Sequence, residues 1–415
     1  MVKFKKISDE KMALLLFVLC WAAYFTSYIG RLNYSSAMTA MIGEQVLSKT
    51  EAGFISMVYF FAYGIGQLTN GFLGDRFHPG KMIFTGLAVA AGANFLMGMT
   101  NSFVMMTVIW GINGYAQAMI WPPIIRIFAE MLEEKQKMKY CVNIVSSQVV
   151  GTLAAYLLAA AVMWLAGWRS VFGAAALCLA VMAVVWLRGF HKVEKFSMEH
   201  GKEAPAAGQK AAGQIQASFS RVLAVSGLIL VIFPVVIHGM LKDGVTSWVP
   251  TYISETFLTS PSLSILVTTV LPVINLTGAY AAQTVYSKCR KREVETAAVF
   301  FAAATAALVG LRLAGDLSII LTAVLFAVIT ASMMAVNTIF VNLLPLRFEK
   351  TGRVSTVSGF LNAMAYLGTA VSTFTIGVMV ERFGWSVTID TWVALTAAAL
   401  ILCLLKRKKV FRIPA

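Results

Sequence analysis

The sequence predicts an all-α integral membrane protein whose twelve transmembrane helices form two pseudo-symmetric bundles of six. Hydrophobic residues make up 59% and charged residues only 13% of the 415 residues, and the mean hydropathy is +0.76. The apolar residues gather in runs of about 20, the length that crosses a bilayer as a helix. These runs are too long and too uniformly apolar for the strands of a membrane barrel. A single long polar segment divides the runs into two sets.

Each run is predicted to be a helix, because only a helix satisfies its own backbone polar groups in lipid. The first set covers residues 12–34, 52–74, 82–101, 103–127, 141–163 and 169–188. The second set covers residues 222–249, 262–286, 295–313, 317–344, 353–379 and 387–405.

The polar segment at 191–216 is rich in Ala, Gly, Gln and charged residues, which is typical of a flexible linker. We therefore expect an N-terminal bundle at 1–190, a cytoplasmic linker at 191–220, and a C-terminal bundle with a basic tail at 221–415. The two halves also resemble each other, which indicates an internal duplication. Corresponding residues at a slowly drifting offset are Arg31 and Lys242, Arg76 and Arg290, and Gly167-Trp168 and Gly384-Trp385.

The net charge of +15 is explained by membrane topology and does not indicate a nucleic-acid-binding surface. If both termini are cytoplasmic, nearly all of the 34 Lys and Arg residues fall on the inner side. The loops of the other side hold only Lys49, Arg169, Arg312 and Arg382. This asymmetry is the positive-inside rule, and it predicts the orientation, with both termini cytoplasmic. We expect the membrane to be the bacterial inner membrane. The first apolar run is too long for a signal peptide, so we expect it to stay as a helix.

Catalytic and metal chemistry find no support in the sequence. The five cysteines are scattered, without the spacing of a disulfide framework or a metal site. Nothing resembles a nucleophile–base pair. We therefore expect no enzyme activity, no metal and no cofactor.

Several predicted helices carry polar side chains three or four residues apart, which places each set on one helix face. Such faces must meet one another or water, because lipid does not satisfy them. We expect them to line a substrate site, although interhelical hydrogen bonding is the alternative for some. The sets are Tyr24, Tyr28 and Arg31; Tyr59, Tyr63 and Gln67; Asn113 and Gln117; Asn143 and Ser147; His238 and Lys242; and Asn362 and Tyr366.

Two cations stand out because each lies within a predicted helix, Arg31 in the first and Lys242 in the seventh. A charge at a helix centre costs about 2.5–3.5 kcal/mol on the insertion scale. We interpret the two as a pair that binds a negatively charged substrate. Phosphate suits this pair, because the Arg31 guanidinium can donate to two oxygens at once and the Lys242 ammonium supplies a point charge. The alternatives are a structural ion pair or snorkelling toward the interface.

Asp243 and His238 leave further alternatives open. Neighbours on a helix point about 100° apart, so direct pairing of Asp243 with Lys242 is expected to be poor. We expect Asp243 to serve a partner on another helix or a gate. The alternative is that it neutralises Lys242 or carries a proton. His238 is expected to be a satisfied structural histidine, with proton coupling as the alternative.

Four motifs resemble a known family. They are "GFLGDRFHPGK" after the second helix, "YIGRLNYS" in the first, "NGYAQAMIWPPIIR" in the fourth and "SWVPTYISE" at the end of the seventh. The first resembles the loop motif of the major facilitator superfamily. The others resemble its organophosphate:phosphate antiporters. The resemblance covers nearly the whole chain and implies the twelve-helix facilitator fold.

The resemblance also implies residue roles. Arg31 and Lys242 match the paired cationic substrate positions. Gln67 stands where familiar members have a lysine, and Val142 where some have a histidine. The matching aromatic residues of the site are Tyr24, Tyr28, Tyr63, Trp121 and Tyr366. The residues expected in gating are Asp75, Arg76 and Arg126, with Asp75 capping the helix that starts near Thr351.

The sequence thus predicts a monomeric secondary transporter that exchanges a small phosphate ester for inorganic phosphate by alternating access. Its expected partners are the anionic substrate, inorganic phosphate and lipid, with no nucleic acid. Two alternatives stay open. One is a proton-coupled or facilitative carrier of a carboxylate such as a sugar acid, and the other is a membrane sensor that binds a ligand without moving it.

Overall fold

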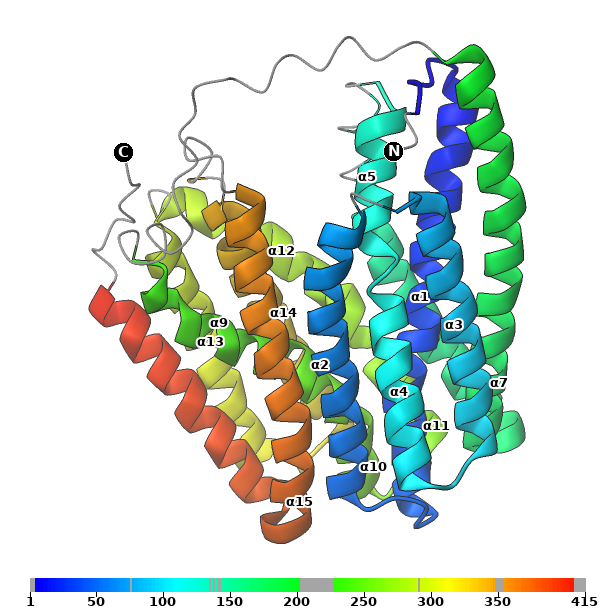
Figure 1. Cartoon of the computed structure of the whole chain (residues 1–415). Helices are drawn as coiled ribbons and strands as arrows, with labels where there is room; N and C mark the ends of the chain where they lie inside the picture. The colour runs from blue at the N-terminus through cyan, green and yellow to red at the C-terminus, as the bar shows by residue number, and fades with distance from the viewer. Residues whose placement is uncertain are drawn as a thin grey trace. The chain divides into compact units, whose positions relative to one another are not determined.

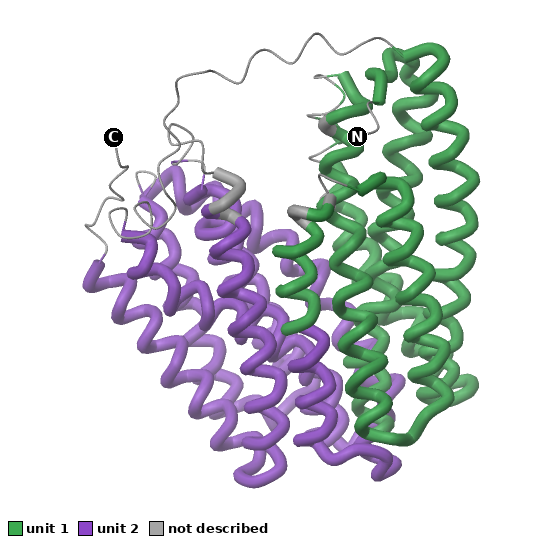
Figure 2. Tube along the Cα trace, viewed as in Figure 1, with its two compact units in different colours: residues 1–41, 61–212 green, residues 42–60, 213–415 purple. Residues whose placement is uncertain are grey.

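The protein is helical throughout most of the part that the computed structural model describes. The described residues are 4–74, 77–133, 136, 139–140, 143–201, 227–289, 292–345, 347 and 354–406. Figure 1 shows the helices coloured along the chain. The chain divides into two compact units, coloured separately in Figure 2. Unit 1 contains residues 1–41 and 61–212, and unit 2 contains residues 42–60 and 213–415. The domain boundaries expected at 190 and 220 stay a prediction.

Unit 1 is built around helices α1, α3, α5 and α7. Their buried side chains form one core that includes Leu16, Ile83, Phe128 and Trp186. The Trp186 indole donates a hydrogen bond to the Gly80 carbonyl at 2.8 Å, which ties α7 to α3. The helices of this part of the chain are α1 (Glu10–Gly43), α2 (Lys49–Gly74), α3 (Pro79–Met99), α4 (Phe103–Gln117), α5 (Trp121–Met131) and α7 (Val145–His200).

Helix α7 runs to His200, past the boundary where the flexible linker was expected to start. Phe190, Val193 and Ser197 are buried on one face of this extension. The Ser197 hydroxyl donates to the Lys5 carbonyl at 2.6 Å. Residues 191–200 are therefore a helix packed on the N-terminal segment rather than linker, because their apolar spacing gives them a face to bury.

Unit 2 contains α-helices and two π-helical segments. Helix α13 packs against α14 and α15, and its core includes Phe301, Phe326 and Phe340. The elements are α9 (Ile229–Gly239), η1 (Met240–Val245), α10 (Thr246–Phe257), α11 (Pro261–Thr268), α12 (Val270–Lys288), α13 (Glu293–Ala314), α14 (Ile319–Asn337), η2 (Thr338–Leu343) and α15 (Val354–Lys406).

Ten helical spans of the described residues are long and apolar enough to cross a membrane. Two of them, within α7 and α15, consist of two helices joined at a non-helical glycine. Each of these two spans therefore covers two of the predicted segments. The joints are Gly167 (φ 75°, ψ −178°) and Gly384 (φ 76°, ψ 179°), which occupy corresponding places in the two halves. Their matching backbone geometry supports the predicted duplication, and the all-α membrane fold is confirmed.

Replacing Gly384 by alanine should lower the melting temperature of the purified protein. A residue with a side chain adopts this backbone conformation at a cost of about 1–3 kcal/mol. No atom lies within 4 Å of the added Cβ, so the backbone conformation alone causes the loss. Gly173 is the matched control, because it also has open space but an ordinary helical φ. Equal melting temperatures of Gly384→Ala and Gly173→Ala would contradict the prediction.

Candidate functional site

Arg31 lies in α1 of unit 1 and contacts two aromatic rings. Its guanidinium carbon is 5.5 Å from the ring centroid of Tyr28 and 4.7 Å from that of Tyr63. Both tyrosines are buried, with 7% and 4% of their surface exposed. Tyr28 precedes Arg31 by three residues, so the two share a helix face. A desolvated cation–π contact is worth up to about 2 kcal/mol, which offsets part of the cost of holding this charge in a membrane helix.

Further aromatic side chains extend this group. Tyr24 packs edge-to-face on Tyr28, with ring centroids 5.3 Å apart, and contacts Trp121 of α5 at 4.6 Å. We call Tyr24, Tyr28, Arg31, Tyr63 and Trp121 the Arg31 cluster. The structure thus brings together five of the residues that the sequence placed in the substrate site. A phosphate ester fits such a surface, because its phosphate pairs with the guanidinium while its carbon skeleton contacts the rings.

A set of buried amides fixes the backbone beside Arg31. The Gly30 carbonyl accepts hydrogen bonds from the side-chain amides of Asn94 at 3.2 Å and Asn113 at 3.1 Å. The Asn33 side-chain amide donates in turn to the side-chain oxygen (Oδ1) of Asn94 at 2.6 Å. Asn113, expected to bind substrate, therefore connects α4 to α1 next to the cation.

Asn33 and Asn94 were missed by the sequence analysis. Asn94 lies in a helix that otherwise offers little polarity, and a single amide in such a helix needs a partner on a neighbouring one. That signal was present in the sequence. It identifies a positioning role but does not say which backbone group is held.

The remaining polar residues of the predicted faces are placed as follows. Gln117 is buried and Gln67 half-buried, and their amide nitrogens have no hydrogen-bond partner among the described residues. Asn362 and Tyr366 lie half-buried on α15 in unit 2. Their roles in substrate binding stay predictions.

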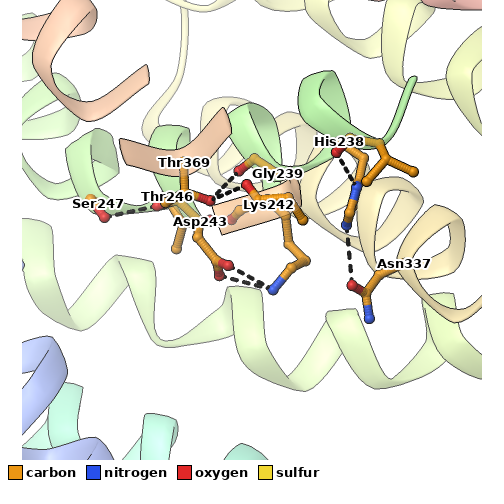
Figure 3. A network of polar contacts seen from close by, with 10 residues as sticks. His238, Gly239, Lys242, Asp243, Thr246, Ser247, Asn337 and Thr369 are labelled. Atoms are coloured by element: carbon orange, nitrogen blue, oxygen red, sulfur yellow. Dashed lines mark hydrogen bonds and ion pairs between the residues drawn. The ribbon is translucent and has the colours of Figure 1, made fainter. Parts of the chain in front are cut away.

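Lys242 of unit 2 forms an ion pair with its neighbour Asp243. The ammonium nitrogen lies 2.8 and 3.0 Å from the two carboxylate oxygens (Figure 3). At an effective dielectric of about 20 their gross attraction is about 6 kcal/mol, most of which desolvation offsets. The expectation that these neighbours pair poorly is therefore wrong. Lys242 is therefore not a lone cation.

The local backbone explains this pairing. Both residues belong to η1, and a π-helix holds more residues per turn than an α-helix, so successive side chains diverge less. Hydroxyl groups satisfy the carbonyls of this segment. Thr369 of α15 donates to the Gly239 carbonyl at 2.9 Å and Ser372 to that of Met240 at 3.2 Å. From the first turn of α10, the hydroxyl of Ser247 donates to the Asp243 carbonyl at 2.8 Å.

Close helix packing holds the same segment against α15. A Cβ on Gly239 would lie 2.0 Å from the Ala365 carbonyl oxygen, and one on Gly244 would lie 2.4 Å from the Ser372 hydroxyl. Larger residues at these positions would push η1 away from α15. The backbone that carries the Lys242–Asp243 ion pair is therefore held closely against α15.

His238 is fully buried one turn before Lys242. Its Nδ1 lies 2.6 Å from the Val235 carbonyl oxygen and its Nε2 lies 3.1 Å from the Asn337 side chain (Figure 3). Both ring nitrogens thus have protein partners. This arrangement fits the structural role that the sequence favoured.

Of the predicted gating residues, Asp75, Arg76 and residues 351–353 lie outside the described residues. Arg126 is described, and it binds the Glu130 carboxylate at 2.7 Å and the Phe77 carbonyl at 2.9 Å. These contacts fasten the end of α5 to the segment after α2. The gating role itself stays a prediction.

A second charged group in unit 2 was not predicted. Lys49, at the start of α2, forms an ion pair with Glu255 of α10 at 2.9 Å, and Glu255 also accepts from the Trp385 indole at 2.8 Å. The Glu381 carboxylate accepts from the Thr50 backbone N–H at 2.7 Å, which caps α2. We call Lys49, Thr50, Glu255, Glu381 and Trp385 the Glu255 cluster. It binds the first turn of α2 to α10 and α15.

Comparisons with known proteins agree with this architecture. The chain is 23% identical over 427 residues to a probable hexose phosphate transport protein of Chlamydia muridarum, covering 96% of this chain and 92% of the relative. It is 26% identical over 260 residues to a glycerol-3-phosphate transporter of Bacillus subtilis, covering 59% of this chain and 58% of the relative.

A solved structure with the same fold is a bacterial homologue of the human lysosomal transporter Spinster, in an inward-facing and occupied conformation. It superposes with a TM-score of 0.79 at 13% identity, covering 98% of this chain and 100% of the other. These proteins are transporters, which confirms the expectation that the chain is not an enzyme. Residues 20–361 match the family described as the Major Facilitator Superfamily. Because this match spans most of the sequence, the chain belongs to the Major Facilitator Superfamily.

Proposed function

We propose that the protein exchanges a small phosphate ester, of the sugar or glycerol phosphate class, for inorganic phosphate by alternating access. The observation that carries this proposal is Arg31, a permanent cation within a membrane helix held between the faces of Tyr28 and Tyr63. The names of the relatives, a hexose phosphate and a glycerol-3-phosphate transporter, support the substrate class. We further propose a monomer in the bacterial inner membrane with both termini cytoplasmic.

Counterflow in proteoliposomes tests the exchange. Vesicles loaded with phosphate should accumulate labelled glucose 6-phosphate or glycerol 3-phosphate, and vesicles loaded with sulfate should not. Uptake that does not depend on internal phosphate would contradict the proposed exchange. Ligand binding without any accumulation would favour the sensor.

The second candidate is a proton-coupled carrier of a sugar acid. The Lys242–Asp243 pair favours it, because a carboxylate in a membrane helix is a group that can take up a proton. Uptake of a sugar acid driven by a pH gradient, with no effect of internal phosphate, would support this candidate over exchange.

We propose that the Glu255 cluster opens and closes during alternating access. Glu255→Gln should increase the rate at which a membrane-impermeant maleimide labels Thr50→Cys, in protein whose native cysteines are replaced. The amide loses the charge attraction to Lys49, which at this partial exposure is worth up to about 1 kcal/mol, or about fivefold. Glu51→Gln is the matched control, because Glu51 accepts from the Ser48 backbone N–H beside the same helix turn and is not a member of the Glu255 cluster. Equal labelling of both variants would contradict this role.

A further inference from the structure

Helix α7 of unit 1 is longer than the membrane requires. Its second part begins after the joint at Gly167, which lies between two of the predicted membrane segments and marks one interface. A bilayer core of about 30 Å is crossed by about 20 helical residues, here Trp168 to Leu187. The helix continues to His200. Its last turns therefore lie at the level of the lipid headgroups and beyond.

Within the hydrocarbon, one exposed face of this helix is apolar. Steps of three and four residues place its side chains on the same side of α7. Lipid chains satisfy such a face. Its members, which we call the α7 apolar stripe, are Leu177, Val181, Val184 and Val185, and between 46% and 66% of each is exposed.

The same face continues beyond the hydrocarbon as a row of cations. Arg188 follows Val184 by four residues, and Lys192 and Lys195 follow at helical spacing, all of them exposed. We call Arg188, Lys192 and Lys195 the α7 basic face. Lys195 lies 3.9 Å from the Glu199 carboxylate, whereas Arg188 and Lys192 form no ion pair within the described part of the chain. Like charges at this spacing repel each other, so an anion that contacts both cations is stabilising.

The opposite face of these turns is buried, which fixes the direction of the α7 basic face. Phe190 and Val193 are buried, and the Ser197 hydroxyl donates to the Lys5 carbonyl at 2.6 Å. Figure 1 shows these last turns of α7, in green, at the end of unit 1 where the N-terminal segment lies. The cations are thus presented by a packed helix and stay in line with the α7 apolar stripe.

We propose that the α7 basic face and the α7 apolar stripe together bind an anionic phospholipid. The phosphodiester accepts from the Arg188 guanidinium and the Lys192 ammonium, while the acyl chains lie along the stripe. A dissolved phosphate has no chains and gains nothing from the stripe. This site goes beyond the proposed transport and does not depend on its substrate.

Quenching by brominated lipids tests the proposal at the site itself. A bimane label on Val185→Cys, in full-length protein whose native cysteines are replaced, reports which lipid lies beside it in mixed bilayers. Brominated phosphatidylglycerol should occupy this position about tenfold or more in preference to brominated phosphatidylcholine, because each cation near a charged surface contributes about fivefold. A label on Val299→Cys, on an exposed part of α13, should show little preference.

Arg188→Gln/Lys192→Gln should bring the occupancies of the two lipids beside Val185→Cys close to equal. Lys5→Gln/Lys6→Gln is the matched control, because it removes the same charge from the same end of unit 1 but leaves the α7 basic face intact. This control should keep the preference. Equal losses in both double variants would indicate a diffuse attraction to the whole surface and would overturn the site.

Two measurements on the labelled protein with its cations intact complete the test. High salt should weaken the preference, because exposed charges are screened, and this result decides if Arg188→Gln/Lys192→Gln does not fold. Excess inorganic phosphate should leave the quenching unchanged. No preference for phosphatidylglycerol, a preference that persists in high salt, or displacement of the lipid by phosphate would each overturn the inference.

Discussion

Arg31→Ala is expected to reduce transport at least about 100-fold while the protein still folds. In the proposed site the guanidinium binds phosphate oxygens through paired charge-assisted hydrogen bonds, each worth about 1.5–3 kcal/mol, and alanine would remove all of them. It leaves the rings of Tyr28 and Tyr63 in place but without charge between them. Exchange of labelled phosphate in proteoliposomes measures the loss. A melting curve of the purified variant checks the fold.

Two comparisons sharpen this result. Arg31→Lys keeps the charge and the contact with the rings but loses the planar fork, so it should retain partial transport. Arg169→Ala is the matched control, because Arg169 also lies over an aromatic ring, that of Trp168 at 4.2 Å, outside the Arg31 cluster. Its loss should alter stability without lowering substrate affinity. Near-normal exchange by Arg31→Ala would remove this residue from the site.

Lys242→Ala is expected to abolish exchange and to destabilise the protein as well. Removing one partner of a buried ion pair costs about 3–5 kcal/mol, and the 26% exposure of Asp243 places this pair near the lower end. The cost arises because the carboxylate stays in the membrane without its cation. Thermal unfolding in detergent measures the stability, and phosphate exchange measures the function.

The double variant Lys242→Ala/Asp243→Ala separates the two effects. Removing both charges should restore most of the melting temperature, because the carboxylate that lost its Lys242 partner is removed as well. Exchange should stay lost, because the cation that we propose to bind the anionic substrate is gone. A double variant that regains exchange would show that Lys242 serves only to balance Asp243.

Local sequence features predicted much of the fold and part of the site. The length of the apolar runs placed the membrane helices, and the repeated Gly-Trp pairs marked both joints. Helical spacing brought Tyr24, Tyr28 and Arg31 onto one face, as the contacts among them confirm. These features depend on hydropathy and on periods of three or four residues, which a single chain displays without knowledge of its neighbours.

Other features escaped prediction because they depend on more distant groups. The π-helical turn that unites Lys242 and Asp243 has its carbonyls satisfied by hydroxyls from α15, more than a hundred residues away. Similarly, Asn94 is recognisable as polar, but only packing decides that it holds the Gly30 carbonyl.

The sequence by itself therefore predicted an all-α membrane protein, a resemblance between its halves and two cations within its helices, since each follows from composition and spacing. The tertiary structure alone decided how those cations are satisfied. Arg31 lies between aromatic faces, one of them supplied by α2, and Lys242 pairs with a carboxylate beside it. The physical reason is that the free energy of a charge in a membrane is set by the groups that replace water around it, and those groups are gathered by folding.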